Sequence, residues 1–147
     1  MKIQCSNEIL RPPEVVFPWI AEPEKAMQWQ KNVKGGEITG ETPEIIGTTF
    51  KEVIEEDGNV LEMEGMITEY KQDEFIGFHI QSKIHEFDVR YALEEVNKAT
   101  KVSIEVTIDW KFPMNVVRLF IGKKIEAGLV NQLNSELLDL KRICEEV

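Results

Sequence analysis

The sequence has few of the residues on which small metal-bound or disulfide-bonded proteins depend. Its 147 residues include two cysteines, Cys5 and Cys144, and two histidines, His79 and His85. Cysteines this far apart form neither a zinc pattern nor a CxxC redox pair, and a metal site needs three or four convergent ligands. We therefore expect no metal, no cofactor and two reduced thiols, with a bridge between the two ends of the chain as the alternative.

Long apolar runs are also missing. No run approaches the roughly 18 residues of a membrane span. The first ten residues, MKIQCSNEIL, contain neither the apolar core nor the cleavage site of a signal peptide. We expect a cytoplasmic protein without membrane insertion. A chain with 42% hydrophobic and 30% charged residues has ordinary globular composition, and its length predicts one domain over residues 1–147.

Basic residues are scarce in the middle of the chain. The net charge is −10, and the stretch from Glu37 to Glu74 carries all of it, with 12 acids against Lys51 and Lys71. Such a domain repels phosphate groups, so we expect no nucleic-acid partner and no attraction to anionic membranes. The acids are interpreted as solubilising charges that protect sheet edges, or else as a docking face for a basic partner.

The N-terminal third predicts one strand and two short helices. The strand covers Lys2 to Leu10. Pro12-Pro13 ends it and suits the first turn of a helix from Glu14 to Ile20, because proline lacks only an N–H that would be unpaired there. Glu22-Pro23-Glu24 begins a second short helix through Trp29. Gly35-Gly36 is expected to break the chain.

The residues from 48 to 111 have the period-2 alternation of strands. The expected strands are 48–55, 60–70, 76–80, 87–93 and 102–110. Asp57-Gly58 is a hairpin signal between the first two. In the second strand, Leu61, Met63 and Ile67 share the inner face, and Glu69 follows them in register. Because short loops allow hairpins but not parallel crossovers, we predict an antiparallel meander with one buried face.

The period then changes to that of a helix, from about Asn115 to Glu146. One apolar stripe runs along it, made of Val117, Phe120, Ile121, Ile125, Leu129, Leu133, Leu137, Leu140 and Cys144. A helix of this length needs a large apolar surface, which the inner face of the sheet supplies. Gly122 and Gly128 lie inside it, either for close packing or as a soft region that opens over a cavity.

This order of elements, with several local motifs, resembles the START-like or SRPBCC superfamily. The superfamily includes the birch-pollen-allergen-like and polyketide cyclase/dehydrase families. The matching motifs are Pro13–Phe17, Glu22–Glu24 followed by Trp29, Ile46–Phe50, Gly65–Tyr70 and Leu137–Lys141. The resemblance implies an α+β helix-grip fold, in which a curved antiparallel sheet of about six to seven strands and two short N-terminal helices enclose an apolar cavity under a long C-terminal helix.

The resemblance also implies binding of a lipid, sterol, polyketide or similar small hydrophobic molecule in that cavity. It brings no catalytic motif, because the superfamily shares none, so fold alone does not settle function. Our candidate ligand-binding residues are Trp29, Phe50, Met63, Ile67, Phe78, His85, Phe87, Tyr91, Trp110 and Phe120. Tyr91 is the preferred polar contact, because a buried phenol needs a hydrogen-bond partner. The orientation of 48–55 stays open.

Three functions are compatible with the sequence. The first is reversible binding of a small hydrophobic molecule. The second is a cyclase or dehydratase that uses His85 and Tyr91 as an acid–base pair, which requires both side chains within about 3 Å of a common point. The third is a protein-interaction module, which requires a closed core and an exposed apolar patch. A homodimer stays open, because the sequence shows no symmetric seam.

Overall fold

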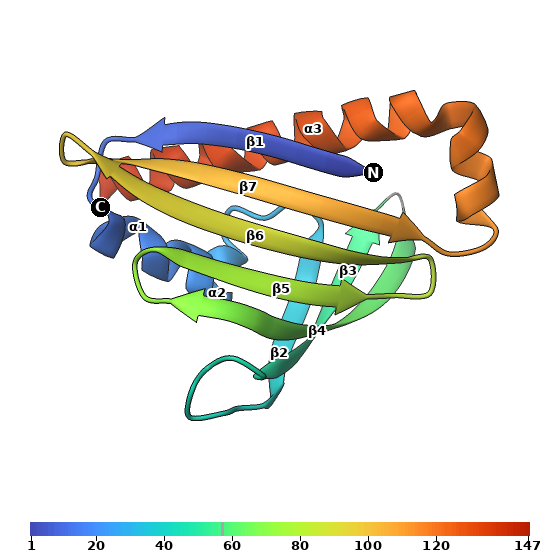
Figure 1. The fold of residues 1–147 in the computed structure, drawn as a ribbon, viewed down its shortest axis with the longest axis horizontal. Coiled ribbons are helices and arrows are strands. Elements are labelled where there is room, and N and C mark those ends of the chain that lie inside the picture. The colour runs from blue at the N-terminus through green and yellow to red at the C-terminus, as the bar shows by residue number, and fades with distance from the viewer. Residues whose placement is uncertain (57) are drawn as a thin grey trace.

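The computed structural model describes residues 1–56 and 58–147, so Asp57 of the expected Asp57-Gly58 hairpin lies outside the described residues. Helices and strands follow in the order anticipated from the sequence (Figure 1). Their bounds are β1 Lys2–Ile9, α1 Pro13–Ala21, α2 Pro23–Ala26, β2 Val33–Gly40, β3 Thr49–Glu56, β4 Asn59–Lys71, β5 Phe75–Gln81, β6 His85–Val96, β7 Ala99–Trp110 and α3 Met114–Glu146.

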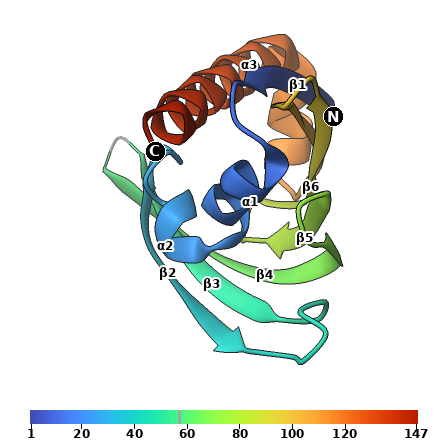
Figure 2. The ribbon, with the colours of Figure 1, turned by 90° about the vertical axis from the view of Figure 1, so that its left-hand side faces the viewer.

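The seven strands form one antiparallel sheet with the order β1-β7-β6-β5-β4-β3-β2. Figure 2 shows that the sheet curves strongly, with α1 and α2 inside the curve and α3 across its upper rim. This arrangement confirms the α+β helix-grip fold. Within the described part of the chain, no helix combines the length and the apolar character that crossing a bilayer requires.

Alternation along the strands produces the core. On β7, Val102, Ile104, Val106 and Ile108 are buried, and the residues between them point to the outer face. The C-terminal half of α3 covers this layer, and its Leu137, Leu140 and Cys144 are at most 1% exposed. Cys144 and Cys5 are free thiols, so the alternative bridge between the ends of the chain is not formed.

Two local expectations are wrong. Gly35-Gly36 does not break the chain but lies within β2, where Gly35 pairs with Val53 and Gly36 with Glu52 of β3. Glu69 does not continue the inner face of β4. A bulge between Ile67 and Glu69 inserts one residue opposite β5, which turns Glu69 to the outer face, where its carboxylate accepts a 3.1 Å hydrogen bond from Arg90 Nε.

The long helix α3 is not continuous. Ile121 has non-helical dihedrals, with φ −125° and ψ 16°, so the helix kinks immediately before Gly122. In Figure 1 the first turns of α3 run at a steep angle to the rest, beyond the end of the sheet. The apolar stripe therefore reaches the core only in its C-terminal half, and Val117, Phe120 and Ile121 are exposed.

Candidate functional site

A cavity of about 420 Å³ lies between the concave face of the sheet, the segment from α2 to β2 and the middle of α3. Most of its lining side chains are apolar. Eight of the ten candidate residues line it: Phe50, Met63, Ile67, Phe78, His85, Phe87, Tyr91 and Trp110. The closed core that a protein-interaction module would require is therefore not found. Whether these side chains bind a ligand stays a prediction.

The other two candidates do not line the cavity. Trp29 is 2% exposed and belongs to the packed core, where its indole N–H donates a 2.7 Å hydrogen bond to the Trp19 carbonyl and its ring meets Tyr91 edge to face. Phe120 is 84% exposed, because the kink at Ile121 carries the start of α3 away from the sheet. The expectation that these two residues line the cavity is wrong.

The shape of the cavity near β3 depends on Gly65 of β4, which has no side chain. The ring of Phe50 lies over Gly65 of β4, so close that a Cβ at Gly65 would come within 2.3 Å of it. From there the ring packs edge to face against Phe78, with centroids 5.7 Å apart. Phe50 faces inward, and alternation then turns Glu52 inward as well, which resolves the orientation of β3.

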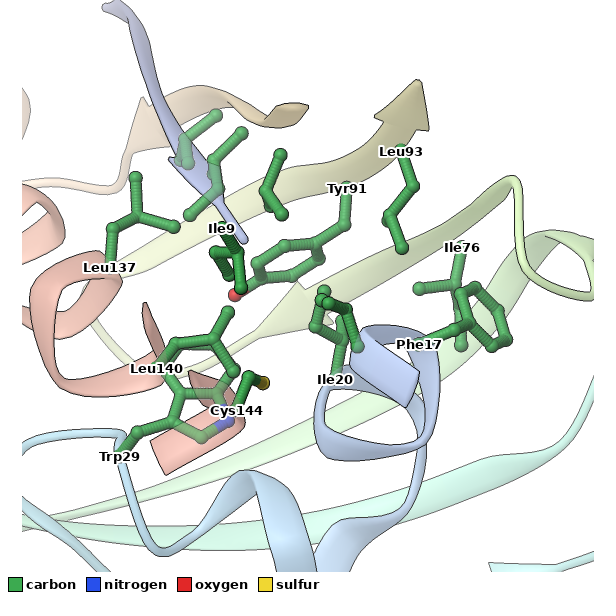
Figure 3. Packing of buried hydrophobic residues seen from close by; sticks show 14 of the residues in the cluster. Ile9, Phe17, Ile20, Trp29, Ile76, Tyr91, Leu93, Leu137, Leu140 and Cys144 are labelled. Atoms are coloured by element: carbon green, nitrogen blue, oxygen red, sulfur yellow. The ribbon is translucent and has the colours of Figure 1, made fainter. Parts of the chain in front are cut away.

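Tyr91 is a deeply buried polar side chain of the cavity wall. It extends from β6 toward α3, as Figure 3 shows, and is 7% exposed. Burial is the main cause that raises the pKa of Tyr91, and the negative charges of Glu136 and Glu52 raise it further. A hydrogen bond with Gln30 acts in the opposite direction. Two carboxylates thus lie close enough to the phenol to oppose its ionisation.

Glu136 joins α3 to the chain between α2 and β2. Its carboxylate accepts a 2.6 Å hydrogen bond from the backbone N–H of Lys31, and the residue is 6% exposed. Burial raises the pKa of Glu136 above 4.5, although the Lys31 N–H opposes the shift. The carboxyl group therefore takes up protons more readily than a carboxyl in water.

Glu52 enters the cavity from β3. Burial alone raises the pKa of its carboxyl group above 4.5. Among residues 1–56 and 58–147, no hydrogen bond or ion pair involves this carboxylate. The same part of the chain contains no group of three His, Cys, Asp or Glu side chains suited to a metal ion.

The sequence analysis missed Glu52 and Glu136. A signal existed for Glu136, because it stands at the helical spacing of Leu133, Leu137 and Leu140 and so falls on the apolar stripe of α3. Glu52 had a weaker signal. It alternates with Phe50 and Ile54, but which face of that strand points inward could not be decided without its pairing to β4.

His85 forms a second polar point in the cavity wall. The Ser82 hydroxyl accepts the backbone N–H groups of Ile84 and His85 at 3.2 Å each and lies 2.6 Å from His85 Nδ1. With two donors already bound, the hydroxyl directs its own hydrogen to Nδ1 at 2.6 Å rather than to the His85 carbonyl oxygen at 3.3 Å, and on this basis we assign the proton of the neutral ring to Nε2. Burial lowers the pKa of His85, so the ring is neutral at pH 7.

Trp110 pairs with His85 across β6 and β7, and the two rings are 5.2 Å apart. Its indole N–H is buried without a partner among the described residues. An unpaired buried donor is costly, about 1–3 kcal/mol, and rare in folded proteins. This N–H has almost no accessible surface and does not face the cavity, so the polar group that the cavity wall presents here is the His85 ring, whereas the wall around Tyr91 presents carboxylate acceptors.

The distance between these two polar points excludes one hypothesis. His85 and Tyr91 lie six residues apart on the same face of β6, which corresponds to about 20 Å along an extended strand. They line one cavity but cannot both reach a point within about 3 Å. The acid–base pair of His85 and Tyr91 is therefore wrong. His79 faces outward, where it contacts Asp88 and Glu86.

Solved structures of several proteins have the same fold. The protein TTHA0849 from Thermus thermophilus superposes with a TM-score of 0.83 at 15% identity, over 98% of this chain and 97% of that one. The Zhui aromatase/cyclase from Streptomyces sp. R1128 gives 0.80 at 11%, over 99% and 93%. A START superfamily protein from Mycobacterium smegmatis gives 0.68 at 14%, over 93% and 98%. At these identities the likeness shows the fold alone.

Sequence comparison is more specific about family than about activity. Among proteins with curated functions, no sequence matches this chain significantly. A family model described as "Polyketide cyclase / dehydrase and lipid transport" matches residues 1–144, nearly the full length.

Proposed function

Because the chain belongs to the polyketide cyclase / dehydrase and lipid transport family, we propose that it binds an elongated, mostly apolar small molecule between the sheet and α3. The cavity of about 420 Å³ carries this proposal. Apolar pockets of such a volume with a few polar groups are the usual sites of small molecules. Burying about 300 Å² of ligand would contribute roughly 7 kcal/mol before ordering costs.

The carboxyl groups near Tyr91 favour a ligand that donates hydrogen bonds. Glu52 and Glu136 accept hydrogen bonds when ionised, and Glu52 has no partner among the described residues. A ligand hydroxyl or amine would supply the missing donor, whereas a ligand carboxylate would add a third negative charge to a poorly hydrated site. The proposed ligands are therefore alcohols, phenols or amines rather than free fatty acids.

The donor at the His85 end of the cavity favours an acceptor on the same ligand. Nε2 of His85 carries a proton in the tautomer assigned above, and His85 lines the cavity. A ligand carbonyl or ether oxygen there would accept from this N–H. Since about 20 Å of strand separates His85 from Tyr91, a ligand that reaches both points must be elongated.

The first experiment is native mass spectrometry of the purified protein before and after a denature–refold cycle. We expect a stoichiometric small-molecule adduct that is lost on refolding, and its mass restricts the ligand class. A protein that carries no adduct and binds no member of a panel of fatty alcohols, sterols and aromatic polyketides would contradict the proposal.

Matched ligands test the polar assignment separately. A fatty alcohol and the fatty acid of equal chain length differ only at the polar group, and we expect the alcohol to bind more tightly at neutral pH. Glu52→Gln should reduce that preference, and Tyr91→Phe should weaken binding of both compounds. His79→Gln, on the outer face, is the matched control and should leave both affinities unchanged. Equal affinity for the alcohol and the acid would contradict the assignment of a hydrogen-bond donor to the ligand.

A second candidate, a cyclase-type enzyme, is favoured by one observation. Glu52 combines a raised pKa with a place in an apolar cavity near a phenol, which is a common setting for a general acid or base. In this version Glu52 removes a proton alpha to one carbonyl of a poly-β-ketone, and the alpha carbon attacks a second carbonyl carbon of the same ligand. The Tyr91 hydroxyl donates to the oxygen of that second carbonyl, which becomes a hydroxyl and can then leave as water. Liquid chromatography with mass spectrometry after incubation with a poly-β-ketone separates the candidates. A product that Glu52→Gln abolishes, either an isomer of equal mass with a different retention or a molecule lighter by one water, indicates an enzyme, and unchanged mass and retention indicate a binding protein.

A further inference from the structure

Exposed apolar side chains gather at the start of α3, away from the cavity wall. Of the fourteen exposed large hydrophobic residues in the described chain, six fall within ten positions. Leu119 and Phe120 are 73% and 84% exposed, and Phe112, in the loop before the helix, is 78% exposed. The set, called here the α3 patch, is Phe112, Val116, Val117, Leu119, Phe120 and Ile121. An exposed apolar patch of this kind usually marks an interaction site.

Basic residues surround the α3 patch in a chain that is otherwise acidic. Between Asp109 and Glu126 there is no acid, whereas Lys111, Arg118, Lys123 and Lys124 are all present. Arg118, Lys123 and Lys124 form no ion pair with any described residue. The chain has a net charge of −10, yet this one local surface is basic. The expected lack of attraction to anionic membranes therefore does not apply to this surface.

The basic side chains lie next to the apolar ones along the chain. Before the kink at Ile121, Val116, Leu119 and Phe120 follow the i, i+3, i+4 spacing of a single helical face, and Lys123 and Lys124 come directly after the kink. A helix with exposed aromatic and aliphatic side chains beside lysines is typical of segments that lie in a membrane surface, with the apolar side among the acyl chains and the lysines at the headgroups.

We infer that the α3 patch docks the protein on the surface of a membrane that contains anionic lipids. Apolar burial and attraction to the headgroups act together there, because the apolar and the basic side chains lie within the same short stretch, residues 111–124. The acidic stretch from Glu37 to Glu74 is repelled by the same surface, which disfavours orientations that bring this stretch to the membrane. Docking also brings Trp110, at the cavity wall next to Phe112, close to the lipid.

Charge argues against a second copy of this chain as the occupant. In a twofold dimer the same patch faces itself, so Arg118, Lys123 and Lys124 of one copy would oppose those of the other. Vesicles of anionic lipid present the complementary charge instead. This inference does not depend on which molecule occupies the cavity.

Vesicle sedimentation tests the inference with the full chain. We expect binding to vesicles of phosphatidylcholine mixed with phosphatidylglycerol, no binding to phosphatidylcholine alone, and loss of binding at high salt. Phe120→Asp should abolish binding. The double variant Lys123→Gln/Lys124→Gln should weaken it roughly 30-fold, which corresponds to about 1 kcal/mol for each lysine. Circular dichroism and thermal melting confirm that each variant is folded.

Leu138→Asp provides the matched control, because Leu138 is also exposed on α3, at 60%, but lies outside the patch. It should bind vesicles like the unmodified protein. Absence of binding to the anionic vesicles at low salt, or equal loss in Leu138→Asp and Phe120→Asp, would overturn the inference. Sedimentation equilibrium without lipid completes the test, since a dimer that Phe120→Asp dissociates would assign the patch to a second copy instead.

Discussion

The backbone N–H of Lys31 donates a 2.6 Å hydrogen bond to the carboxylate of Glu136, which ties the segment between α2 and β2 to α3. Glu136→Ala removes the acceptor, whereas Glu136→Gln keeps a carbonyl oxygen in its place. We expect the Ala variant to be less stable than the Gln variant by about 1–3 kcal/mol in urea unfolding. The amide of Lys31 should exchange with solvent faster in the Ala variant only. Equal exchange in both would show that the contact is weak.

Glu52 should make stability depend on pH. Its pKa in the native state lies above 4.5, so well below that pH the carboxyl is protonated in both states. As pH rises through the native value, the native state loses stability relative to the unfolded state. Glu52→Gln should therefore gain about 1 kcal/mol at about pH 8 and little at about pH 4. Urea unfolding at the two pH values measures this difference.

The control for that experiment is Glu62→Gln on the exposed face of the neighbouring strand β4. It makes the same chemical change without removing a buried carboxyl, so its effect should be small at both pH values. A gain for Glu52→Gln that does not grow with pH would contradict the assigned burial.

The two histidines should titrate on opposite sides of 6.5. A hydrogen bond with Asp88, and to a smaller extent one with Glu86, raises the pKa of His79, whereas burial lowers the pKa of His85. NMR titration of the ring signals distinguishes the two sites directly. Asp88→Asn should lower the value of His79 and leave that of His85 unchanged. Identical titration of both rings would contradict the different environments on the two faces of the sheet.

Gly65→Ala should disturb the cavity wall. A Cβ at Gly65 would meet the Phe50 ring at 2.3 Å, so the ring must leave its place against Phe78. Overpacking of this kind costs about 1–3 kcal/mol. Gly35→Ala is the matched control, because no atom lies within 4 Å of the added Cβ. Thermal melting of both variants gives the comparison, and similar melting temperatures would show that Phe50 adapts without cost.

Most of the fold could be predicted from the sequence, because it follows from local patterns. Period-2 alternation located the strands of the meander, and period 3.6 located α3. Events that break a period could not be predicted in the same way. The bulge that turns Glu69 outward adds one residue that only the pairing of β4 with β5 reveals. The kink at Ile121 likewise interrupts an apolar helical period that continues in the sequence from Val117 to Ile125.

In the candidate site, too, some residues could be predicted from local patterns and others could not. Inward-facing aromatic residues such as Phe87 and Tyr91 followed from strand alternation and do line the cavity. Trp29 and Phe120 were misplaced because an apolar side chain fits a cavity wall, a filled core or an exposed patch equally well in sequence. Glu136 was overlooked because acids are read as surface residues, although its helical position lies on the buried stripe. Ligand identity and cellular location stay predictions.

The pairing of β1 with β7 also sets the order in which the chain can fold. Residues Lys2 to Ile9 hydrogen-bond opposite Thr107 to Thr100, about one hundred positions later. At roughly 5–20 residues per second, a ribosome delivers β7 on the order of 5–20 seconds after β1. During that interval β1 has no partner strand, and α3, which packs on β1, cannot yet cover it. The strand β1 therefore pairs only after β7 has been synthesised and is covered only after α3 follows, and folding finishes only when synthesis is nearly complete.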